Sequence, residues 1–442
     1  MKPSRRLGFL GLSILSVVLT SSKAMAVPSY ARQTGLACNV CHNNPPELTA
    51  FGRKFKLNAY TLTDLKTEAP IEGKDLSINR FLPLSAMILV ADTSINTPVP
   101  ATQNGTVQFP QILSIFLAGE FAPHIGGQVQ TTYSHSSDHF TLDNTDLRFA
   151  QQARFFSNDL LYGFTLNNSP TVDDLWNSTP SWGYPWISPT TAPSPIAKPL
   201  LVGPLAQDVA GVGAYSMWRD HLYLGTSAYR TEHIGGPQPV NGTNYPINIQ
   251  GVAPYWRAAW QQFWGRNYLE VGTYGIHVNS TPGSVSGLRD SYTDPAIDAQ
   301  YERPFGQNSL TVHGTYLHES SNLAATFAAG NAAFPGHHLN TFRADANYHI
   351  HGRFRLTGAG FSTTGNTDPI LYAPAPATGS ATGSPDTAGY IAQAGWWPRQ
   401  NIELSFQYTG YTKFNGSSTN YDGSGRNASA NNTAFVSLWM SF

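Results

Sequence analysis

Two cysteines and a histidine, Cys38, Cys41 and His42, stand at the spacing C-x-x-C-H. This spacing is typical of covalent attachment of a c-type haem, in which two thiols form thioethers with the porphyrin and the histidine binds one axial face of the iron. The chain holds two cysteines in all. Half a zinc site would need two further Cys or His ligands at a recognisable spacing, and no such pair stands out. We therefore predict that Cys38, Cys41 and His42 bind one covalent haem c.

The motif does not fix the second axial ligand of the iron. No His or Met occurs from residue 43 to residue 86, so this ligand must come from farther along the chain or be water. Met87 is the first candidate, because it lies in the expected opening strand, residues 82–91, on the face that carries Ser85. A thioether ligand raises the reduction potential of a haem. Met87 also fits a packing or lipid-facing role. His313 and His349 fall on polar strand faces and fit the polar lining of a lumen better than iron ligation.

The first residues have the composition of an export signal. Basic residues precede an apolar run over residues 7–19, and a small-x-small cleavage pattern ends at Ala26. Residues 1–26 are therefore predicted to be a secretory signal peptide. Removing its four basic residues changes the formal net charge from -1 to -5. So weak a charge gives no reason to expect a nucleic-acid partner.

The rest of the chain has the pattern of strands with two unlike faces. Only 12% of the residues are charged, against roughly 25% in an ordinary soluble protein. No uninterrupted apolar stretch of about 20 residues follows residue 26, which argues against a transmembrane helix. From about residue 80, segments alternate polar and apolar positions. Between residues 402 and 409, for example, every even position is apolar and every odd position is polar.

Short and long connections alternate along this region, which is typical of an outer-membrane barrel with periplasmic turns and extracellular loops. Short turns are expected near 123–126, 157–159, 219–220, 265–267, 305–308, 351–353 and 398–401. Longer connections are expected at 95–106, 136–143, 170–204, 233–250, 280–292, 321–337, 366–387 and 414–431. Fifteen connections imply sixteen antiparallel strands and a mainly β transmembrane barrel of porin size. Four tryptophans are expected at the membrane interfaces: Trp256, Trp260, Trp396 and Trp439.

Residues 27–79 are too few to bury much core on their own. A helix is predicted to follow Asn44, with Leu48, Phe51 and Phe55 on one apolar face against the porphyrin. Its basic residues are expected to point elsewhere: Arg53, Lys54 and Lys56. Arg53 or Arg32 is the candidate partner for a haem propionate.

The N-terminal region resembles a known family over four segments, which are residues 28–35, 38–42, 46–49 and 51–57. They are similar to the N-terminal signature of the outer-membrane monohaem cytochrome-porin fusions of iron-oxidising bacteria. The resemblance implies that Cys38, Cys41 and His42 bind haem in a protein of the outer membrane of a Gram-negative bacterium. It further implies that the chain oxidises extracellular Fe(II) and passes electrons to a periplasmic c-type cytochrome or another carrier.

We expect residues 27–79 to be a monohaem cytochrome c domain and residues 80–442 to be the barrel in outer-membrane lipid. The apolar band of such a barrel is about 25 Å tall, more than one porphyrin can bridge, so the haem domain is expected to plug the lumen. Acidic lumen residues would draw Fe(II) inward or simply line the wall: Asp294, Asp298, Glu302, Asp345 and Glu403. Arginines would balance their charge: Arg148, Arg154, Arg257 and Arg343.

Two alternative functions stay open at this point. One is a solute porin in which the haem domain is a plug or sensor without obligatory electron flow. The other is an electron conduit for a different extracellular donor or acceptor. Whether the chain counts as an enzyme, an Fe(II)-oxidising cytochrome, depends on which of these functions holds.

Overall fold

The structure, a computed structural model, describes residues 29–62, 68–70, 77–79, 82–99, 102, 104–135, 138–179, 188–203, 205–206, 208–231, 247–283 and 286–442. The predicted signal peptide, residues 1–26, lies outside these ranges. The described residues include no helix that is long and apolar enough to cross a membrane.

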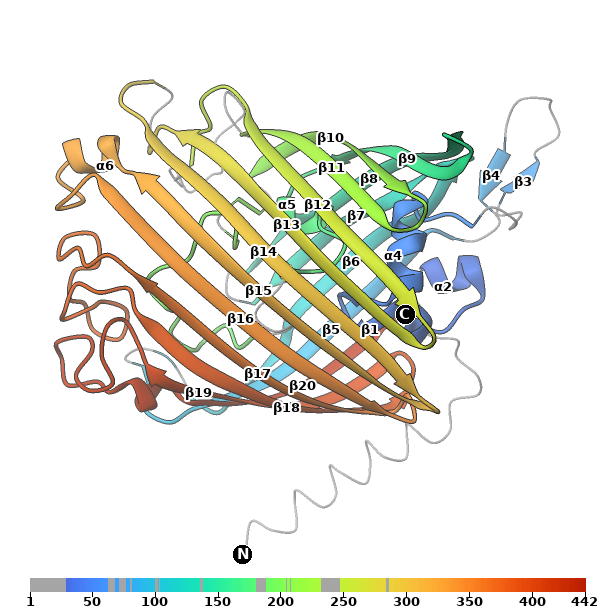
Figure 1. Ribbon diagram of the computed structural model, residues 1–442. Helices are drawn as coiled ribbons and strands as arrows, with labels where there is room; N and C mark the ends of the chain where they lie inside the picture. Colours follow the sequence, from blue (N-terminus) through green and yellow to red (C-terminus); the bar gives the residue numbers. More distant parts are fainter. Residues whose placement is uncertain are drawn as a thin grey trace, which may run out of the picture.

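Sixteen antiparallel strands form one closed barrel (Figure 1), so the predicted strand number is confirmed. The strands are β5 (Leu84–Ile95), β6 (Thr106–Ala122), β7 (Ile125–Ser134), β8 (His139–Phe155), β9 (Asn158–Asn167), β10 (Val209–Trp218), β11 (Leu222–Thr231), β12 (Ala253–Trp264), β13 (Asn267–Ser280), β14 (Asp290–Phe305), β15 (Asn308–Asn322), β16 (Gly336–Ile350), β17 (Phe354–Gly365), β18 (Thr387–Arg399), β19 (Ile402–Lys413) and β20 (Thr433–Ser441). Each strand pairs with its sequence neighbours, and β20 pairs with β5 to close the ring.

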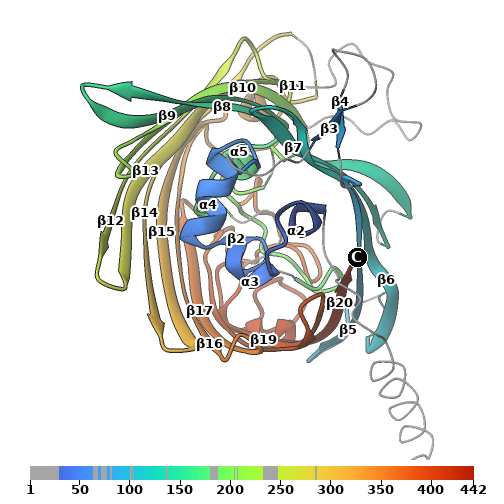
Figure 2. The same cartoon turned by 90° about the vertical axis from the view of Figure 1, so that its right-hand side faces the viewer.

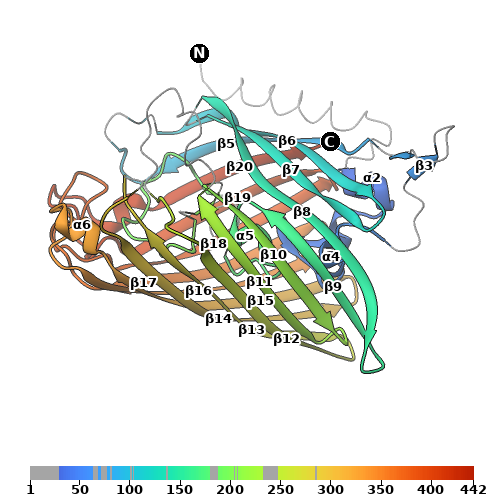
Figure 3. The ribbon, with the colours of Figure 1, turned by 90° about the horizontal axis from the view of Figure 1, so that it is seen from above.

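The connections alternate as predicted between a mouth of short turns and a mouth of longer loops. We call these ends the short-turn mouth and the long-loop mouth; helix α6 (Ala324–Ala328) lies at the latter (Figure 3). The connection between β7 and β8 is shorter than expected, because β8 already begins at His139. In outer-membrane barrels the short turns face the periplasm.

Side chains alternate between an apolar outer surface and a polar interior. On β14, Ile297 is 59% exposed on the outside, whereas Asp298, the next residue, is 4% exposed. An apolar exterior on a closed, even-numbered antiparallel barrel is the architecture of a porin-like outer-membrane protein. Trp260 and Trp396 are exposed, in line with the prediction for the membrane interfaces. The same prediction is wrong for Trp439, which lines two cavities inside the barrel. Side chains alternate in direction along a strand, and the position of Trp439 on β20 points inward.

The N-terminal residues lie inside the barrel at the short-turn mouth (Figure 2). We call residues 29–61 the plug. They form three helices and a small strand pair: α2 (Ser29–Thr34), α3 (Cys38–Cys41), β1 (His42–Asn44), β2 (Glu47–Leu48) and α4 (Ala50–Leu57). The helix expected after Asn44 begins at Ala50 instead, because the intervening residues pair as β1 and β2. A second pair, β3 (Glu68–Pro70) and β4 (Ser77–Asn79), lies between the plug and the barrel in sequence.

The connection between β9 and β10 also folds into the lumen. It carries α5 (Pro170–Asp173), which lies within the ring of strands beside α4 in Figure 2. Trp176 donates its indole N–H to the Tyr268 hydroxyl on the wall at 2.8 Å, and Leu200 donates its amide to Glu319. We call residues 168–208, where described, the inner loop. The prediction that this segment is an extracellular loop is therefore wrong for the part that enters the lumen.

Candidate functional site

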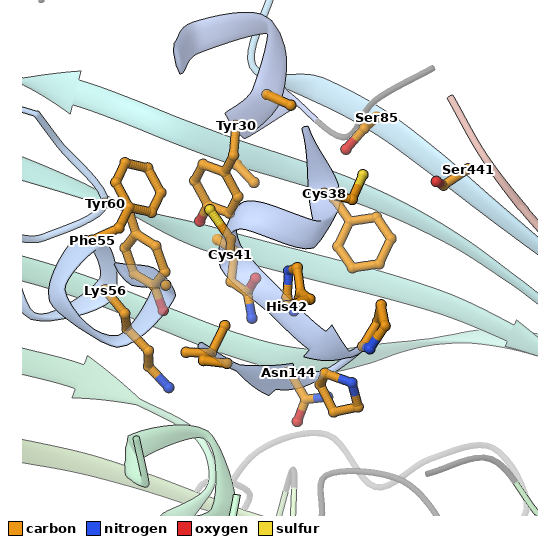
Figure 4. A pocket seen from close by; sticks show the side chains of 18 of the residues that line it. Tyr30, Cys38, Cys41, His42, Phe55, Lys56, Tyr60, Ser85, Asn144 and Ser441 are labelled. Carbon is orange, nitrogen blue, oxygen red and sulfur yellow. The ribbon is translucent and has the colours of Figure 1, made fainter. Parts of the chain in front are cut away.

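The C-x-x-C-H motif forms a single helical turn, α3, followed by His42. Residues three apart on a helix lie close together, and Cys38, Cys41 and His42 all line one cavity beside this turn (Figure 4). Burial raises the pKa of both thiols, that of Cys41 to about 11. Neutral, partly buried thiols of this kind are poor nucleophiles and poor zinc ligands.

Helix α4 and its N-cap residue, Thr49, hold the α3 turn in place through hydrogen bonds and close packing. Thr49 donates its hydroxyl to the Val40 carbonyl at 2.6 Å and its amide to the Cys41 carbonyl at 2.9 Å. The same hydroxyl accepts from the amide of Gly52 at 3.1 Å and so caps the helix. A Cβ atom on Gly52 would lie 2.1 Å from the Cys41 carbonyl oxygen. Glycine is therefore required for α4 to approach the motif this closely.

A cavity of about 240 Å³ adjoins the motif, and we call it the first cavity. Both cysteines and His42 line it. Most of the remaining lining is apolar or aromatic, including Tyr30, Phe55, Tyr60, Phe116, Leu175 and Trp439. Tyr30 stacks on Tyr60 at 5.2 Å between ring centroids, so part of this lining is a packed aromatic wall.

The residues present fit a haem c. Two thiols and a histidine that line one apolar, aromatic cavity are what a covalently held porphyrin requires. Burial lowers the pKa of His42, which favours the neutral imidazole that binds metals. A zinc site does not fit, because the described part of the chain contains no group of three or more His, Cys, Asp or Glu residues that could hold a metal ion.

Of the three candidates for the second axial ligand, only Met87 lines the first cavity together with the motif. It lies on β5, pairs with Ser441 of β20 and is 3% exposed. His313 lies elsewhere in the lumen, 3.9 Å from Asp345. His349 lines a different cavity, described next. Ligation by Met87 stays a prediction.

A second cavity, of about 390 Å³, opens at the short-turn mouth on Cys38 and His42. Its other walls come from the ends of β16 and β18 and from the turns that follow them, with His349, His351, Arg353, Trp397, Arg399 and Gln400. Trp439 and Pro45 line both the first and the second cavity, so the two cavities adjoin at the motif. Among the described lining residues of the second cavity there is no Asp or Glu.

Helix α4 is bound to the barrel wall through Arg53. Its guanidinium is 2.7 Å from the Glu302 carboxylate of β14, donates to the Leu48 carbonyl at 2.6 Å and stacks 4.5 Å from the centre of the Tyr268 ring. Arg53 is only 2% exposed, whereas Phe51 is 38% exposed. The predicted orientation of α4 is therefore wrong at Phe51, which is exposed and does not line the first cavity, whereas Arg53 points away from that cavity as expected.

Lys56 and Tyr60 make a second buried connection between the plug and the wall. The Lys56 ammonium donates to the carbonyls of Val172 and Asp174 on the inner loop and is 4.0 Å from Asp146 of β8. The Tyr60 hydroxyl donates to Asp146 at 2.6 Å. Burial lowers the pKa of Lys56 to about 8, and the nearby Arg148 charge acts in the same direction. Lys56 thus contacts the wall and the inner loop and also lines the first cavity, contrary to the prediction that it points away from the porphyrin.

The two arginines proposed for a haem propionate are engaged elsewhere. Arg53 is paired with Glu302, and Arg32 donates to the carbonyl of Leu84 at the start of the first strand. The sequence carries no local signal for either partner, because Leu84 and Glu302 lie 52 and 249 positions away.

Most of the acidic residues expected to draw Fe(II) are bound to the wall, to the plug or to the inner loop. Arg257 pairs with Asp298 at 2.6 Å, and Arg355 pairs with Glu403 at 2.8 Å. Asp294 accepts from the amide of Leu201, and Asp345 accepts from Asn347 at 2.7 Å. These contacts favour the structural alternative, in which the charges line the wall and hold it together. Arg154 does not face the lumen: its side chain is 81% exposed beside Asp159.

A third cavity, of about 330 Å³, lies between the inner loop and the wall. Lys198 and Arg343 line it, and no Asp or Glu is found among its described lining residues. Burial and the charge of Arg343 lower the pKa of Lys198. Thr171 lines both this cavity and the first one, so the third cavity adjoins the space beside the motif.

No protein-family model and no curated protein matches this chain. Solved structures similar to it include in-vitro folded OmpT, an outer membrane protein of Vibrio cholerae, with 9% identity over 85% of this chain and 100% of that one and a TM-score of 0.44. The outer membrane channel DcaP of Acinetobacter baumannii has 12% identity over 81% and 96% and a TM-score of 0.46. OmpF of Salmonella typhi, in complex with daunomycin, has 13% identity over 82% and 98% and a TM-score of 0.48. None of these likenesses assigns a function to this chain.

Proposed function

We propose that this porin-like outer-membrane protein is an electron conduit that carries one covalent haem c and oxidises extracellular Fe(II). One observation supports this above others: Cys38, Cys41 and His42 line a single apolar cavity inside the short-turn mouth of the barrel. A porin that served only for solute passage would have no use for this residue set at that place.

Each residue of the motif would have a defined role in this proposal. Cys38 and Cys41 would hold the porphyrin through thioethers, and His42 and Met87 would bind its iron. A haem bound there would supply reversible one-electron chemistry at its iron. The aromatic wall of Tyr30, Phe55 and Tyr60 limits the access of water, and the hydrogen bonds of Thr49 keep the motif oriented.

The position of the motif in the fold supports one direction of electron transfer in this proposal. The motif lies at the short-turn mouth, which faces the periplasm in barrels of this class. A periplasmic cytochrome or another carrier could therefore approach the motif from that side. The Fe(II) donor would approach from the long-loop mouth, through the lumen beside the inner loop.

The test uses the purified, detergent-solubilised protein. We expect haem staining of the denatured chain on a gel and reduction of the haem absorption bands when Fe(II) is added without oxygen. His42→Ala should abolish that response and keep the heat-modifiable migration of a folded barrel. His124→Ala, at an exposed short turn, is the matched control and should respond as the wild type does. A wild-type chain without covalent haem would reject the proposal.

A second candidate function is solute passage, with the plug as an obstruction or sensor. The porin-like barrel and its buried polar lining support it. Planar-bilayer recordings distinguish the two, since steady ion currents through a chain that contains no haem would favour the solute porin.

A further inference from the structure

The second cavity has the composition of a site for anions. Two exposed arginines line it: Arg353 in the turn after β16 and Arg399 at the end of β18. Neither forms an ion pair within the described part of the chain, in contrast to Arg53, Arg148, Arg257 and Arg355. A cavity that presents two cations, and no carboxylate from its described lining, attracts negatively charged groups.

Four side-chain nitrogen atoms of residues that line the same cavity are buried without a hydrogen-bond partner among the residues described. Two belong to the plug, Nδ1 of His42 and Nδ2 of Asn43, and two to the barrel, Nε2 of His349 and Nε1 of Trp439. The indole nitrogen can only donate, and leaving a buried donor unpaired is energetically costly. His349 stacks on Trp397, which fixes its ring against the wall. An acceptor that reaches into the cavity would satisfy the two barrel atoms.

The position of the second cavity indicates which hydrogen-bond acceptor would lie next to it. The second cavity shares Cys38, His42, Pro45 and Trp439 with the first cavity. A haem held by the cysteines has an apolar body and two propionate carboxylates, which need cations or N–H donors when they leave water. Arg32 and Arg53, the candidates from the plug itself, are engaged with other partners.

We propose that the second cavity binds the two propionate groups of the haem, with Arg353 and Arg399 as charge partners and Trp439 as a buried donor. This inference rests on the proposed function, because it requires that Cys38 and Cys41 carry haem. It adds a recognition site that belongs to the barrel: the barrel turns would bind one end of a group whose other end is fixed to the plug.

The test measures the reduction potential of the haem in the purified full-length protein. We expect the double variant Arg353→Gln/Arg399→Gln to have a more negative potential than the wild type, because loss of two cations leaves the carboxylate charge unbalanced near the iron. The shift should grow as ionic strength falls. Both arginines are exposed, so barrel folding should be unchanged, as heat-modifiable migration will show.

Two further variants sharpen this experiment. Arg266→Gln removes an exposed arginine from the turn after β12, outside the cavity, and should leave the potential unchanged. Trp439→Phe keeps a ring and removes the indole donor, and should shift the carboxylate bands in the infrared difference spectrum between the oxidised and reduced protein.

The outcomes separate the possibilities. An unchanged potential in a double variant that still contains haem would overturn the proposal. An unchanged potential with a salt-dependent loss of electron transfer to an acidic soluble redox protein would also overturn it, and would make the cavity a docking surface. Absence of haem from the wild type would instead reject the proposed function, and the haem stain reports that separately.

Discussion

Single residues at the short-turn mouth fall into two groups, those that pair with the barrel wall and those that face the second cavity with a buried nitrogen unpaired. Arg53 pairs with Glu302, and Tyr60 donates to Asp146 of the wall. His349 and Trp439 each keep a buried nitrogen unpaired in the part of the chain that is described. Because an unpaired buried polar group is costly, the second group indicates where a ligand belongs and the first group indicates what holds the plug.

Met87 can be tested as the second axial ligand by a substitution that preserves volume. Met87→Leu should cost less than about 1.5 kcal/mol of stability and leave the covalent haem in place. We expect loss of the near-infrared charge-transfer band that sulfur ligation gives the oxidised haem, together with a lower reduction potential. Met440→Leu on the adjacent strand, outside the cavity lining, is the control. A wild-type spectrum without that band would show that another ligand binds the iron.

Lys56 should make the attachment of the plug depend on pH. Its pKa is about 8 in the docked plug and would return to 10.5 if the helix were released. Between these values the released form binds more protons, so docking should strengthen as pH rises through this window and be weakest below about pH 8. The rate of limited proteolysis of the plug, compared at about pH 8 and about pH 10.5, measures the strength of docking. The pH effect should disappear in Lys56→Gln and persist in Lys54→Gln; equal slopes in all three proteins would contradict the assignment.

At the scale of elements, the strands were predictable and the packing of the helices was not. Alternation with a period of two and the turn residues are local signals, and they located all seven short turns. The partner of α4 is a wall residue far away in sequence, so its buried basic face left no local trace. The inner loop did leave a local signal in the sequence. It contains Leu175, Trp176 and Leu201, large apolar residues that are unfavourable in a solvent-exposed loop.

The contact between α3 and α4 depends on Gly52. Gly52→Ala would place a methyl group against the Cys41 carbonyl and should cost about 1–3 kcal/mol by overpacking. We expect less covalent haem per chain and roughly tenfold or faster amide hydrogen exchange in the plug. Phe51→Ala, at an exposed position on the same helix, should leave both values near those of the wild type. Normal haem content and exchange in Gly52→Ala would show that the helices can separate without loss.

The Arg53–Glu302 pair should control whether the plug closes the lumen. Arg53→Gln leaves a carboxylate of low exposure without its partner, at a cost of about 3–5 kcal/mol, and should raise single-channel conductance in planar bilayers. In the double variant Arg53→Gln/Glu302→Gln, the plug should again close the lumen in part, because no unpaired carboxylate remains at position 302. Lys54→Gln removes an exposed pair with Asp220 and should change stability by no more than about 1 kcal/mol. A conductance that is the same in all variants would show that the plug does not limit the current.

At the scale of the whole molecule, we expect the basic lining of the third cavity to influence which ions the lumen favours. Lys198 and Arg343 should make currents in the conducting Arg53→Gln background selective for anions. Lys198→Glu should move the reversal potential in a salt gradient toward cation selectivity, whereas Lys413→Glu, outside the cavity, should have a smaller effect. Such selectivity would favour Fe(II) donors that arrive as negatively charged complexes. Cation selectivity in the parent variant would contradict this expectation.

The enclosure of the plug sets an order for biogenesis. The plug precedes the first strand, and that strand pairs with the last strand of the barrel, so the ring is sealed only after the whole chain has been exported. Contacts of the plug with β8 and β14 join residues that are far apart in sequence. We therefore expect a haem ligation enzyme to modify the thiols on a soluble periplasmic precursor, before the insertion machinery closes the wall around them. Quality control of such a protein would have to monitor cofactor loading and membrane insertion as successive steps.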